Sequence, residues 1–480
     1  MARGVLFRRL HSRPKEEPLH PEPFTRLHRY LFALSLVALF PLASLPAAAA
    51  ERLCDTSFQD CRAPLLTLIA NERVRIDVAF DMMEDDVMAD ALIKRFKGGV
   101  PVRVLMDPRR NAVSARNAAI LQKLAAAGIP MRGKTSGSSL HWKFMLFAGQ
   151  ETLEAGAANF SDYYFIPVTP YLNYTDEAVF FTDDDALVDS FKTRMDDAWT
   201  TTVQITNYAN VTSLARQYDT FAISPDLNFV PWQNFSKRAV PRYDAETKQI
   251  DVMMYKITEP GHADGLIRAV KRGVPVRLIV EPSWYRNPAN VWQAYNVDRL
   301  HAAGVRIRVR AHAGFTHQKS VLLYAQAMSI FGSSNWTSES NTSQHEHNYF
   351  TTKDWILAWF KANFNRKWGN STGKAETKAF TPLPPDKPVY TAPASLAAGQ
   401  PRTGVTLTWK PGPWAHKADI YFGTTSSPPL LAANVSVSPS TTKKYAVQTP
   451  VAGRTYYWKI VSKTMANQTA AGPVWSFTTQ

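Results

Sequence analysis

The segment LHWKFMLF at residues 140–147 returns in the second half of the chain as THQKSVLLY at residues 316–324. Each copy holds a His and a Lys two positions apart, with an Asn and then a Glu further along the chain at matching places. The two sets are His141, Lys143, Asn159 and Glu177, and His317, Lys319, Asn335 and Glu346. Two sets in register indicate one site built across a pseudo-twofold axis.

The repeat extends well beyond these residues, through three further pairs of matching segments. The pairs are RIDVAF (75–80) with QIDVMM (249–254), KGGVPVRVLMDP (97–108) with KRGVPVRLIVEP (271–282), and LAAAGIPMR (124–132) with LHAAGVRIR (300–308). The first copy carries an insertion around residues 166–174. Loops accept insertions more readily than cores do. The two copies therefore predict two units of the same fold.

Hydrophobic periodicity in each copy alternates between the pattern of strands and the pattern of helices. In the first copy we expect strands over 75–80 and 100–106, helices over 86–96, 115–127 and 184–199, and further strands over IPMR, LHWKFMLF and EAVFFT. This order predicts an α/β fold with mixed or parallel sheets. In the closing helix of the second copy, the four-residue spacing of Trp355 and Trp359 favours a buried face.

We expect the two α/β units to pack as a pseudo-dimer and to precede a different kind of module. The predicted boundaries are 51–205 for the first repeat, 206–239 for a connection, 240–370 for the second repeat and 371–390 for a proline-rich linker. Residues 391–480 contain short β-like runs between Gly, Pro and Ser clusters, which predicts a small all-β sandwich. Trp409, Tyr421, TYYWKIV and GPVWSFTT in this region resemble a fibronectin type III module.

The first 50 residues are typical of a secretory signal. A basic region is followed by an uncharged stretch over 30–50 that ends in PAAAA. This order predicts cleavage near Ala50 and a secreted or periplasmic protein with bacterial-type export; an uncleaved membrane anchor is the alternative. The only cysteines, Cys54 and Cys61, follow the predicted cleavage point and are expected to form a disulfide in an exported protein.

The charge of the chain suits anionic partners. The formal net charge is +15, and the first 50 residues contribute seven Lys or Arg against three Glu, so the mature chain carries +11. A basic surface attracts phospholipid headgroups or nucleic acid without choosing between them, and a solubility charge accounts for it equally well. The composition, 45% hydrophobic and 20% charged, is that of an ordinary globular protein.

The repeated residues suit attack on a phosphodiester. Residues two apart in a strand share a face, so each His and Lys pair presents an imidazole beside an ammonium. One histidine can attack phosphorus while the other protonates the leaving alcohol and then activates water. The lysines and asparagines can hold the phosphoryl oxygens, and a glutamate can fix a histidine tautomer. This chemistry needs no metal and no other cofactor.

At these residues the chain resembles the phospholipase D superfamily, whose HKD signature reads HxK, four residues, Asp, then GG or GS, one residue, Asn. The resemblance covers both repeats. It implies two α/β repeats with the paired motifs at their interface and a metal-independent phosphohistidine mechanism. It makes His141 and His317 the nucleophile and the general acid/base, with His141 favoured as nucleophile. Lys143, Lys319, Asn159 and Asn335 would bind phosphate, and Glu177 and Glu346 would orient the histidines.

The chain departs from that signature in both copies. Ala148 and Tyr324 stand where the family has Asp, and the first repeat reads GAAN where the second reads GSSN. We expect the family's Asp to support a loop, so its loss does not predict inactivity. Ser333, Ser334 and Trp336, beside Asn335, are candidate substrate-binding residues, and a tight turn or core packing is the alternative for them. Trp284 and Tyr285 are further candidates for lining a pocket, where aromatic rings could hold a quaternary ammonium headgroup.

The leading hypothesis is a secreted phosphodiesterase that hydrolyses phospholipids such as phosphatidylcholine to phosphatidic acid and a free headgroup. The C-terminal module would act as a spacer or attachment module, and no stable protein partner is expected. A secreted metal-independent nuclease of the same superfamily is the main alternative, because the same chemistry cleaves nucleic acid. A phosphatidyl transferase and a non-catalytic anion-binding or adhesion protein also remain open.

Overall fold

The computed structural model describes residues 51–449 and 451–480. The predicted signal peptide over 1–50 lies outside the described residues. Among the helices of the described part, none is long and apolar enough to cross a membrane.

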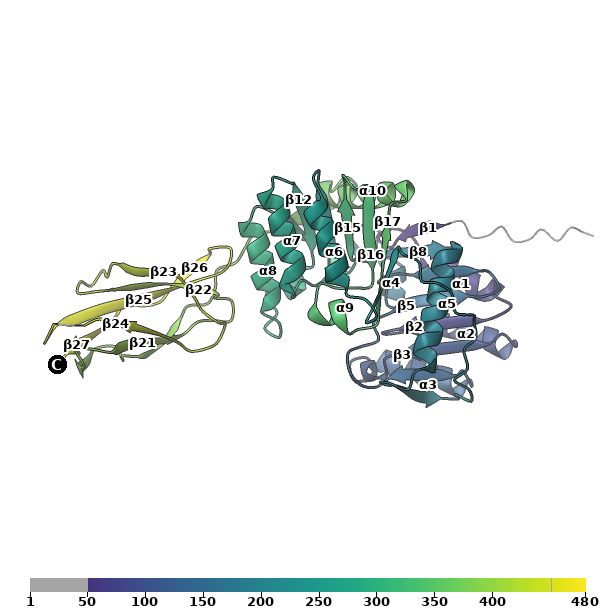
Figure 1. Cartoon of the computed structure of the whole chain (residues 1–480), viewed down its shortest axis with the longest axis horizontal. Helices are drawn as coiled ribbons and strands as arrows, with labels where there is room; N and C mark the ends of the chain where they lie inside the picture. The colour runs from purple at the N-terminus through teal and green to yellow at the C-terminus, as the bar shows by residue number, and fades with distance from the viewer. Residues whose placement is uncertain (1–50, 450) are drawn as a thin grey trace, which may run out of the picture. The chain divides into compact units, whose positions relative to one another are not determined.

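The two repeats form two eight-stranded sheets with the same strand order (Figure 1). The first sheet, in spatial order, consists of β1 (Arg52–Asp55), β8 (Ala178–Thr182), β6 (Thr152–Ala155), β5 (Lys143–Phe147), β2 (Ile76–Phe80), β3 (Val102–Met106), β4 (Met131–Lys134) and β9 (Ile205–Ala209). The second consists of β10 (Leu227–Val230), β17 (Glu346–Thr351), β16 (Met328–Gly332), β15 (Ser320–Leu323), β11 (Ile250–Met254), β12 (Val276–Val280), β13 (Arg306–Arg310) and β18 (Thr377–Ala379).

Both sheets are mixed, which confirms one of the two predicted arrangements. In the first sheet β2, β3 and β4 pair in parallel, and the remaining pairs are antiparallel. The parallel strands are joined by helices, as crossover connections require. Their helix starts follow ordinary capping rules: the Asp85 carboxylate accepts from the backbone N–H groups of Val87 and Met88.

Three helices cover the outer face of each sheet, and one long helix packs on its inner face. The outer helices are α1 (Arg62–Asn71), α2 (Asp86–Lys97) and α3 (Ala115–Ala126) in the first repeat, and α6 (Phe235–Ala245), α7 (Pro260–Lys271) and α8 (Trp292–Ala302) in the second. The inner helices are α5 (Asp185–Thr200) and α10 (Asp354–Gly369). The short elements are η1 (Pro108–Ala112), η2 (Pro282–Trp284), α4 (Asp162–Phe165) and α9 (Ser338–Thr342).

A single central core joins the inner faces of the two sheets. It contains apolar residues of α5 and α10 together with residues of both sheets. On α10 the buried stripe consists of Ile356, Leu357, Phe360 and Phe364, and Trp359 is only partly buried. The prediction that Trp355 is buried is wrong: its exposed fraction is 38%, because it lies beside this stripe and not within it.

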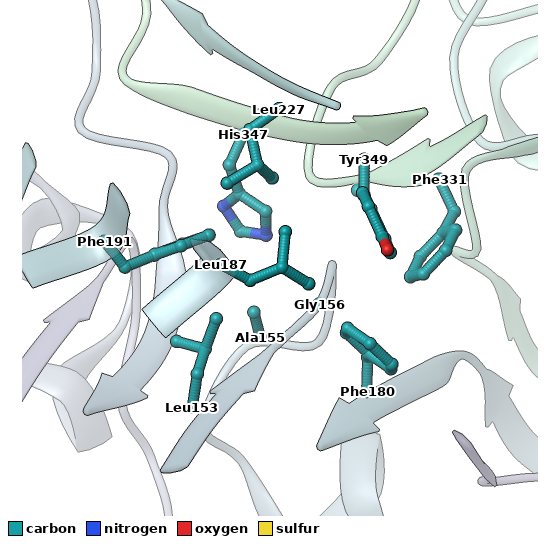
Figure 2. A pocket seen from close by; sticks show the side chains of 11 residues that line it. Leu153, Ala155, Gly156, Phe180, Leu187, Phe191, Leu227, Phe331, His347 and Tyr349 are labelled. Atoms are coloured by element: carbon teal, nitrogen blue, oxygen red, sulfur yellow. The ribbon is translucent and has the colours of Figure 1, made fainter. Parts of the chain in front are cut away.

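Figure 2 shows a small apolar cavity of about 20 Å³ within the central core. His347 projects into it among apolar side chains that include Leu187 and Phe191. Neither ring nitrogen of His347 has a hydrogen-bond partner among the described residues. Burial lowers the pKa of His347 to about 3, so this imidazole is neutral and behaves as a packing residue.

The second repeat has more elements than its predicted boundaries contain. β10 and the start of α6 fall in the segment expected to connect the repeats, and β10 pairs with β17 at the edge of the second sheet. β18 falls in the predicted linker and pairs with β13. Both strands are only three or four residues long, which is too short for alternation of polar and apolar residues to reveal them.

The C-terminal region forms two further sheets that share one core. One sheet contains β19 (Val389–Ala392), β21 (Val405–Lys410) and β24 (Lys443–Val447); the other contains β20 (Ala397–Gln400), β22 (Lys417–Gly423), β23 (Leu430–Ser436), β25 (Thr455–Lys463), β26 (Thr469–Ala471) and β27 (Trp475–Thr479). Trp409 of the first sheet and Trp458 of the second are fully buried in that core. The region is all-β, as expected, and its likeness to fibronectin type III stays a prediction.

Candidate active site

Short parallel pairings across the repeats position the candidate catalytic residues. β7 (Asn173–Asp176) pairs with β14 (Ala313–Thr316), and a single bridge joins Leu140 to His345. In each pairing the residue before a candidate His lies opposite the residue before a candidate Glu. The backbone N–H of His141 donates to the His345 carbonyl (3.0 Å), and that of His317 donates to the Asp176 carbonyl (3.1 Å).

Each histidine is consequently bonded to the glutamate of the other repeat. His141 Nδ1 lies 2.9 Å from Glu346 Oε2, and His317 Nδ1 is hydrogen-bonded to Glu177 Oε1. Both glutamates are fully buried, and both histidines are more than nine-tenths buried. All four predicted residues are therefore brought together, and both histidines line the cavity described below.

The two pairs differ in the groups around the carboxylate. Glu346 Oε2 accepts from Ser333 Oγ (2.5 Å), and Glu346 Oε1 accepts from Ser340 Oγ (2.8 Å). The first repeat has GAAN in place of GSSN and offers Glu177 no such hydroxyl; Glu177 Oε2 has no hydrogen-bond partner among the described residues. Hydroxyl donors stabilise the ionised carboxylate of Glu346 relative to that of Glu177.

The histidines and asparagines line one cavity of about 390 Å³ between the repeats. Its other walls carry aromatic and charged side chains, among them Tyr164, Tyr255, Trp284, Arg110, Lys256, Asp81 and Glu339. Lys143 and Lys319 lie behind the histidines: Lys143 Nζ donates to the His141 carbonyl (2.8 Å), and Lys319 Nζ lies 3.0 and 3.1 Å from the two ring nitrogens of His317.

Burial shifts the pKa values of the site toward neutral forms. It raises the pKa of Glu177 to about 8 and that of Glu346 to about 7. It lowers the pKa of both histidines well below the usual range, with the neighbouring lysines adding to the effect. Burial also lowers the pKa of Lys143 to about 8 and that of Lys319 to about 7. A bound phosphate would favour the charged lysines again.

A lysine occupies an aromatic face in this cavity. Lys256 Nζ lies 3.8 Å from the centroid of the Trp284 ring, and burial lowers the pKa of Lys256. Trp284 thus lines the pocket, as one of the two alternatives for it predicted. Tyr285 does not: its hydroxyl donates to Asp298 Oδ1 (2.6 Å) in the outer core.

Two acidic residues that the sequence interpretation left without a role hold the chain just before each histidine. Asp107 Oδ2 accepts from the N–H of Leu140 (3.2 Å), and Glu281 Oε2 accepts from the N–H of Thr316 (2.8 Å). The sequence did contain a signal, because an acid followed by proline ends the same strand in both copies, in LMDP and IVEP.

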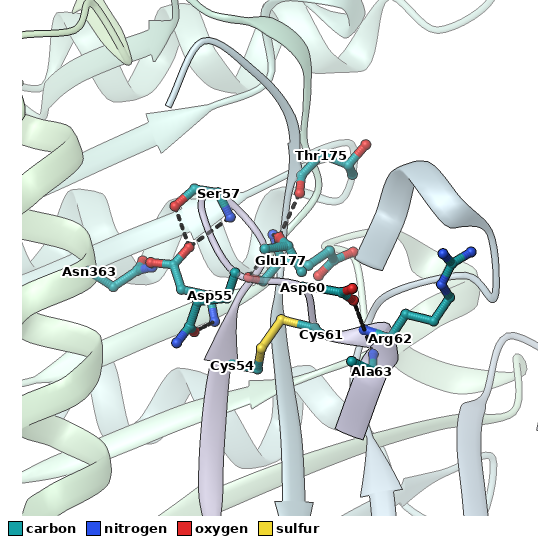
Figure 3. The surroundings of a disulfide bond; sticks show 12 residues. Cys54, Asp55, Ser57, Asp60, Cys61, Arg62, Ala63, Thr175, Glu177 and Asn363 are labelled. Carbon is teal, nitrogen blue, oxygen red and sulfur yellow. Dashed lines mark hydrogen bonds between the residues drawn. A yellow bond between two sulfur atoms is a disulfide. The ribbon is translucent and has the colours of Figure 1, made fainter. Parts of the chain in front are cut away.

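The predicted disulfide is confirmed and lies beside Glu177 (Figure 3). Cys54 and Cys61 join the end of β1 to the start of α1. Between them, Thr56 Oγ donates to the Thr175 carbonyl (2.7 Å), and the N–H of Glu177 donates to Thr56 Oγ (2.8 Å). The disulfide therefore closes a loop that contains Thr56, and the Thr56 side chain holds the backbone of Glu177, a candidate catalytic residue.

The positions where the family has its Asp lie far from the chemistry. Lys319 immediately precedes β15 and Tyr324 follows it, so the two residues are five steps apart along the strand, or roughly 16 Å. The Tyr324 hydroxyl instead donates to Asp251 Oδ2 (2.6 Å). Ala148 lies just beyond β5 in the same way. The expectation that the family's Asp supports a loop stays a prediction.

The three candidate substrate-binding residues lie behind the cavity and do not line it. Ser333 binds the Glu346 carboxylate, and Ser334 Oγ accepts from Asn348 Nδ2 (2.8 Å). Trp336 is fully buried and stacks on His262, with ring centroids 4.6 Å apart. The prediction was that these three residues contact the substrate. In the structure the small GSSN turn faces the core of the second repeat, so the three residues support the site from behind.

Within the part of the chain that the structure describes, no cluster of three or more His, Cys, Asp or Glu side chains is arranged to hold a metal ion.

A family model described as "Cardiolipin synthase, PLD-like domain" matches residues 65–199 and 244–368, together more than half of the chain. The chain belongs to this family. The two matched segments contain the six inner strands of each sheet and both sets of His, Lys, Asn and Glu; the edge strands β1, β9, β10 and β18 lie outside them. The family assignment thus agrees with the superfamily resemblance of the repeated motif, and it does not extend to the C-terminal sheets.

Two curated relatives are similar over part of their length. The mitochondrial cardiolipin hydrolase of Chlamydomonas reinhardtii is 25% identical over 122 residues, which are 25% of this chain and 52% of that protein. Its counterpart from Drosophila melanogaster is 25% identical over 150 residues, 27% of this chain and 57% of that protein. The chain therefore spans little more than half the length of these relatives.

Among solved structures, the fold resembles phosphatidylserine synthase from Haemophilus influenzae Rd KW20. The TM-score is 0.53 at 15% sequence identity, and the match covers 69% of this chain and 88% of that one. At this identity the likeness shows the fold alone, a phospholipase D-like α/β fold in two halves.

Proposed function

We propose that the protein is a metal-independent phosphodiesterase that hydrolyses phospholipids in the manner of phospholipase D. The observation that carries the proposal is the pair of His–Glu hydrogen bonds that cross between the repeats at one cavity. Family membership supports the reaction class, and the names of the curated relatives support a phospholipid substrate.

His141 is the proposed nucleophile. Glu346 is stabilised as a carboxylate by two serine hydroxyls and accepts the Nδ1–H of His141, which leaves a lone pair on Nε2. Attack of Nε2 on phosphorus forms an N–P bond as the P–O bond to the headgroup breaks. Lys143, Lys319, Asn159 and Asn335 would hold the phosphoryl oxygens as their charge redistributes.

His317 is the proposed general acid and base. Burial raises the pKa of Glu177 to about 8, so Glu177 is protonated at neutral pH. The protonated carboxyl can donate a hydrogen bond to Nδ1 of His317, which leaves the ring proton on Nε2, where it is available to the leaving alcohol. Nδ1 takes the proton of Glu177 as Nε2 gives its own away. In the second step the proton transfers are reversed. Nε2 of His317 accepts a proton from water as the water attacks phosphorus. The N–P bond then breaks, which releases phosphatidic acid and regenerates His141.

The proposed substrate class is a phospholipid whose headgroup is anionic, as in cardiolipin, in place of the phosphatidylcholine expected from the sequence. A choline group would seek the face of an aromatic ring. The Trp284 face is already covered by the ammonium of Lys256, which repels a second cation and attracts a second phosphate. The basic charge of the chain supports the same choice.

The experiment offers the purified mature protein, with EDTA present, vesicles of cardiolipin or phosphatidylcholine and single- and double-stranded DNA. We expect release of phosphatidic acid from cardiolipin, its loss in His141→Ala, and a fall of about 10²–10⁴-fold in His317→Ala. DNA cleavage without lipid turnover would show that the protein is a nuclease and not a phospholipase. Dependence on an added alcohol would indicate phosphatidyl transfer, and inactivity on every phosphodiester would indicate a binding protein.

A Lys256→Met variant tests the headgroup class separately. We expect kcat/KM for cardiolipin to fall about tenfold and that for phosphatidylcholine to rise, because the cation over Trp284 is gone. Lys237→Met, which removes an exposed lysine, is the control and should change neither. Equal losses on both lipids would contradict the headgroup proposal and leave the reaction class intact.

We also propose that the protein is exported and that its C-terminal module is of fibronectin type III kind. The disulfide supports export, because such bonds persist in oxidising compartments. Sequencing the N-terminus of protein recovered from the periplasm or medium tests it: a mature start near Glu51 is expected, and retention of the first 50 residues would contradict cleavage.

A further inference from the structure

A second, larger cavity lies on the other side of the chain segment that carries Glu346. Its volume is about 570 Å³, and both repeats contribute to it. Gln344 lines the active-site cavity, whereas Ser343 and His345 line this one. We call it the Lys134 pocket, and its residues used below are Lys134, Ser138, Gln204, Trp232, Ser343 and His345.

Lys134 is buried in this pocket and forms no ion pair with a carboxylate of the described residues. Its exposed fraction is 1%, and its Nζ lies 2.9 Å from His345 Nδ1. Burial lowers the pKa of His345 to about 3, so His345 is neutral and accepts this hydrogen bond without matching the charge. Burial lowers the pKa of Lys134 to about 8, which leaves it charged at neutral pH. A buried cation of this kind is costly unless an anion accompanies it.

At the pseudo-symmetric position in the other half, a buried cation is paired with a carboxylate. Asp176 occupies the place of His345, immediately before the candidate catalytic Glu, and it forms an ion pair with the buried Lys367 (2.5 Å). The counterpart of Lys134 in the second repeat, Arg310, is likewise paired with Glu281 (2.9 Å). Lys367 is thus neutralised by a carboxylate of the first repeat, and Arg310 by one of its own repeat. Asp107, the counterpart of Glu281, is paired with Arg109 instead, and the Lys134 pocket has a neutral imidazole where Asp176 stands in the other half.

The remaining donors of the pocket suit a tetrahedral anion. Ser138 Oγ and Ser343 Oγ lie 2.7 Å apart, one from each repeat, and the side-chain amide of Gln204 lines the same space. The neighbouring arginines, Arg194 and Arg216, are already paired with Asp197. A planar carboxylate is best held by a free guanidinium; an ammonium with rotatable hydroxyls matches phosphate oxygens instead.

An aromatic wall gives the pocket room for an organic group. Trp232 is 41% exposed and stacks on the buried Trp142, with ring centroids 6.0 Å apart and an interplanar angle of 8°. The Arg194 guanidinium lies 4.5 Å from the centroid of the Trp232 ring, so the apolar surface that Trp232 offers beside Lys134 is the part of its side chain that neither Trp142 nor Arg194 covers. Free phosphate would leave that surface exposed, whereas a phosphate ester would cover it.

We propose that the Lys134 pocket is a second anion-binding site, distinct from the active site, that takes a phosphate ester, with Lys134 and the two serines on the phosphate and Trp232 against the organic part. The site does not depend on the proposed function. Because Lys134 and Ser138 come from the first repeat and Ser343 and His345 from the second, a bound ester holds the two repeats together. His345 also accepts the N–H of His141, so the occupied site stabilises the backbone next to the proposed nucleophile.

The test measures the melting temperature of the full mature chain with added ligand. Lys143→Met and Lys319→Met are combined as the background, so that phosphate binding at the active site is removed. We expect inorganic phosphate and a short-chain phosphatidic acid each to raise the melting temperature. The rise is expected to disappear when Lys134→Met is added and to remain with the exposed control Lys237→Met.

A second variant keeps the test independent of how Lys134→Met folds. Ser343→Asp places a negative charge at the rim of the pocket and should also abolish the rise. A larger rise with phosphatidic acid than with inorganic phosphate is expected, because only the ester covers Trp232. An equal or smaller rise would contradict the placement of an organic group against Trp232. No rise in the background protein, or a rise that survives both Lys134→Met and Ser343→Asp, would overturn the site.

Discussion

At the residue scale, the most telling groups are buried ionisable side chains, because burial decides their charge. Lys143 and Lys319 lie behind the candidate catalytic histidines, where desolvation makes the ammonium easier to lose. Glu154, on β6, lies in the core of the first repeat without any hydrogen-bond partner for its carboxyl oxygens among the described residues. The lysines are expected to make the activity depend on pH, and Glu154 is expected to make the stability depend on pH.

The alkaline side of the pH profile is predicted to follow Lys319. Its pKa of about 7 means that the free protein loses this charge, and with it attraction for phosphate, as the pH rises through 7. We therefore expect kcat/KM to fall above about pH 7. Lys319→Arg keeps its charge and should move the fall upward, toward about 8 where Glu177 titrates. Identical alkaline limbs in both proteins would contradict the assignment.

Glu154→Met is predicted to stabilise the protein at neutral pH. Burial raises the pKa of Glu154 well above its usual value, so stability is greatest below the unfolded-state pKa and is lost as the pH rises through the folded-state pKa. Removing the carboxyl should raise the free energy of unfolding at pH 8 by about 1–3 kcal/mol, and by less at pH 4. Urea unfolding at the two pH values measures this; a destabilised variant at pH 8 would refute it.

At the scale of elements, the residues at the ends of two corresponding strands position the candidate catalytic histidines. Asp107 and Glu281 directly follow β3 and β12, and each carboxylate accepts a hydrogen bond from the backbone just before a candidate catalytic histidine. Both residues also cap the short helix that follows, since Asp107 accepts from the N–H of Arg109 and Glu281 from that of Ser283. One side chain thus fixes a strand end, a turn and the approach to the active site.

Glu281→Gln is predicted to lower kcat while changing KM little, because Glu281 acts through the backbone and does not touch the substrate. We expect a loss of about tenfold, as a small displacement of His317 reduces the reactive fraction of bound substrate. Steady-state kinetics on the lipid substrate measures the split. Asp244→Asn, which removes an exposed partner of Arg268, is the control; a loss confined to KM would argue against a positioning role.

At the scale of the whole molecule, the active site exists only because two repeats meet. Neither repeat holds a complete His–Glu pair, since each glutamate is bonded to the histidine of the other half. The central core that joins the inner faces of the sheets sets this geometry. Duplication therefore supplied two half-sites, and the differences between GAAN and GSSN made them unequal.

The crossed pairing is predicted to be visible in the imidazole ¹⁵N chemical shifts of labelled protein. Glu346→Gln should shift the ring signals of His141, and Glu177→Gln those of His317, because each substitution removes the charge at Nδ1. The histidine in the same repeat as the substituted glutamate should change far less. Shifts that follow the same repeat would show that the pairing is not the one described.

The sequence went far in predicting this fold because the duplication doubled every signal. Strand and helix periodicities, read twice in register, predicted the α/β repeats. The candidate His and Asn residues of both sets line one cavity, and the candidate Glu and Lys residues are bonded to those histidines. The short edge strands β10 and β18 were missed, because their pairing depends on neighbours distant in the chain. Ser333, Ser334 and Trp336 were placed on the wrong side of the Asn turn for a similar reason: sequence proximity to Asn335 carries no direction.

By itself the sequence determined the family, the residue types of the active site and the cysteines that form the disulfide, since spacing within short segments is enough for these. Only the tertiary structure decided which glutamate serves which histidine, that Lys256 covers Trp284, and that no carboxylate of the described residues forms an ion pair with Lys134, whereas its counterpart Arg310 is paired with Glu281. The pairs His141–Glu346 and Lys134–His345 join residues about two hundred positions apart, and His317–Glu177 joins residues 140 apart. Contacts of that range are fixed by the packing of the two repeats, which local sequence patterns do not encode.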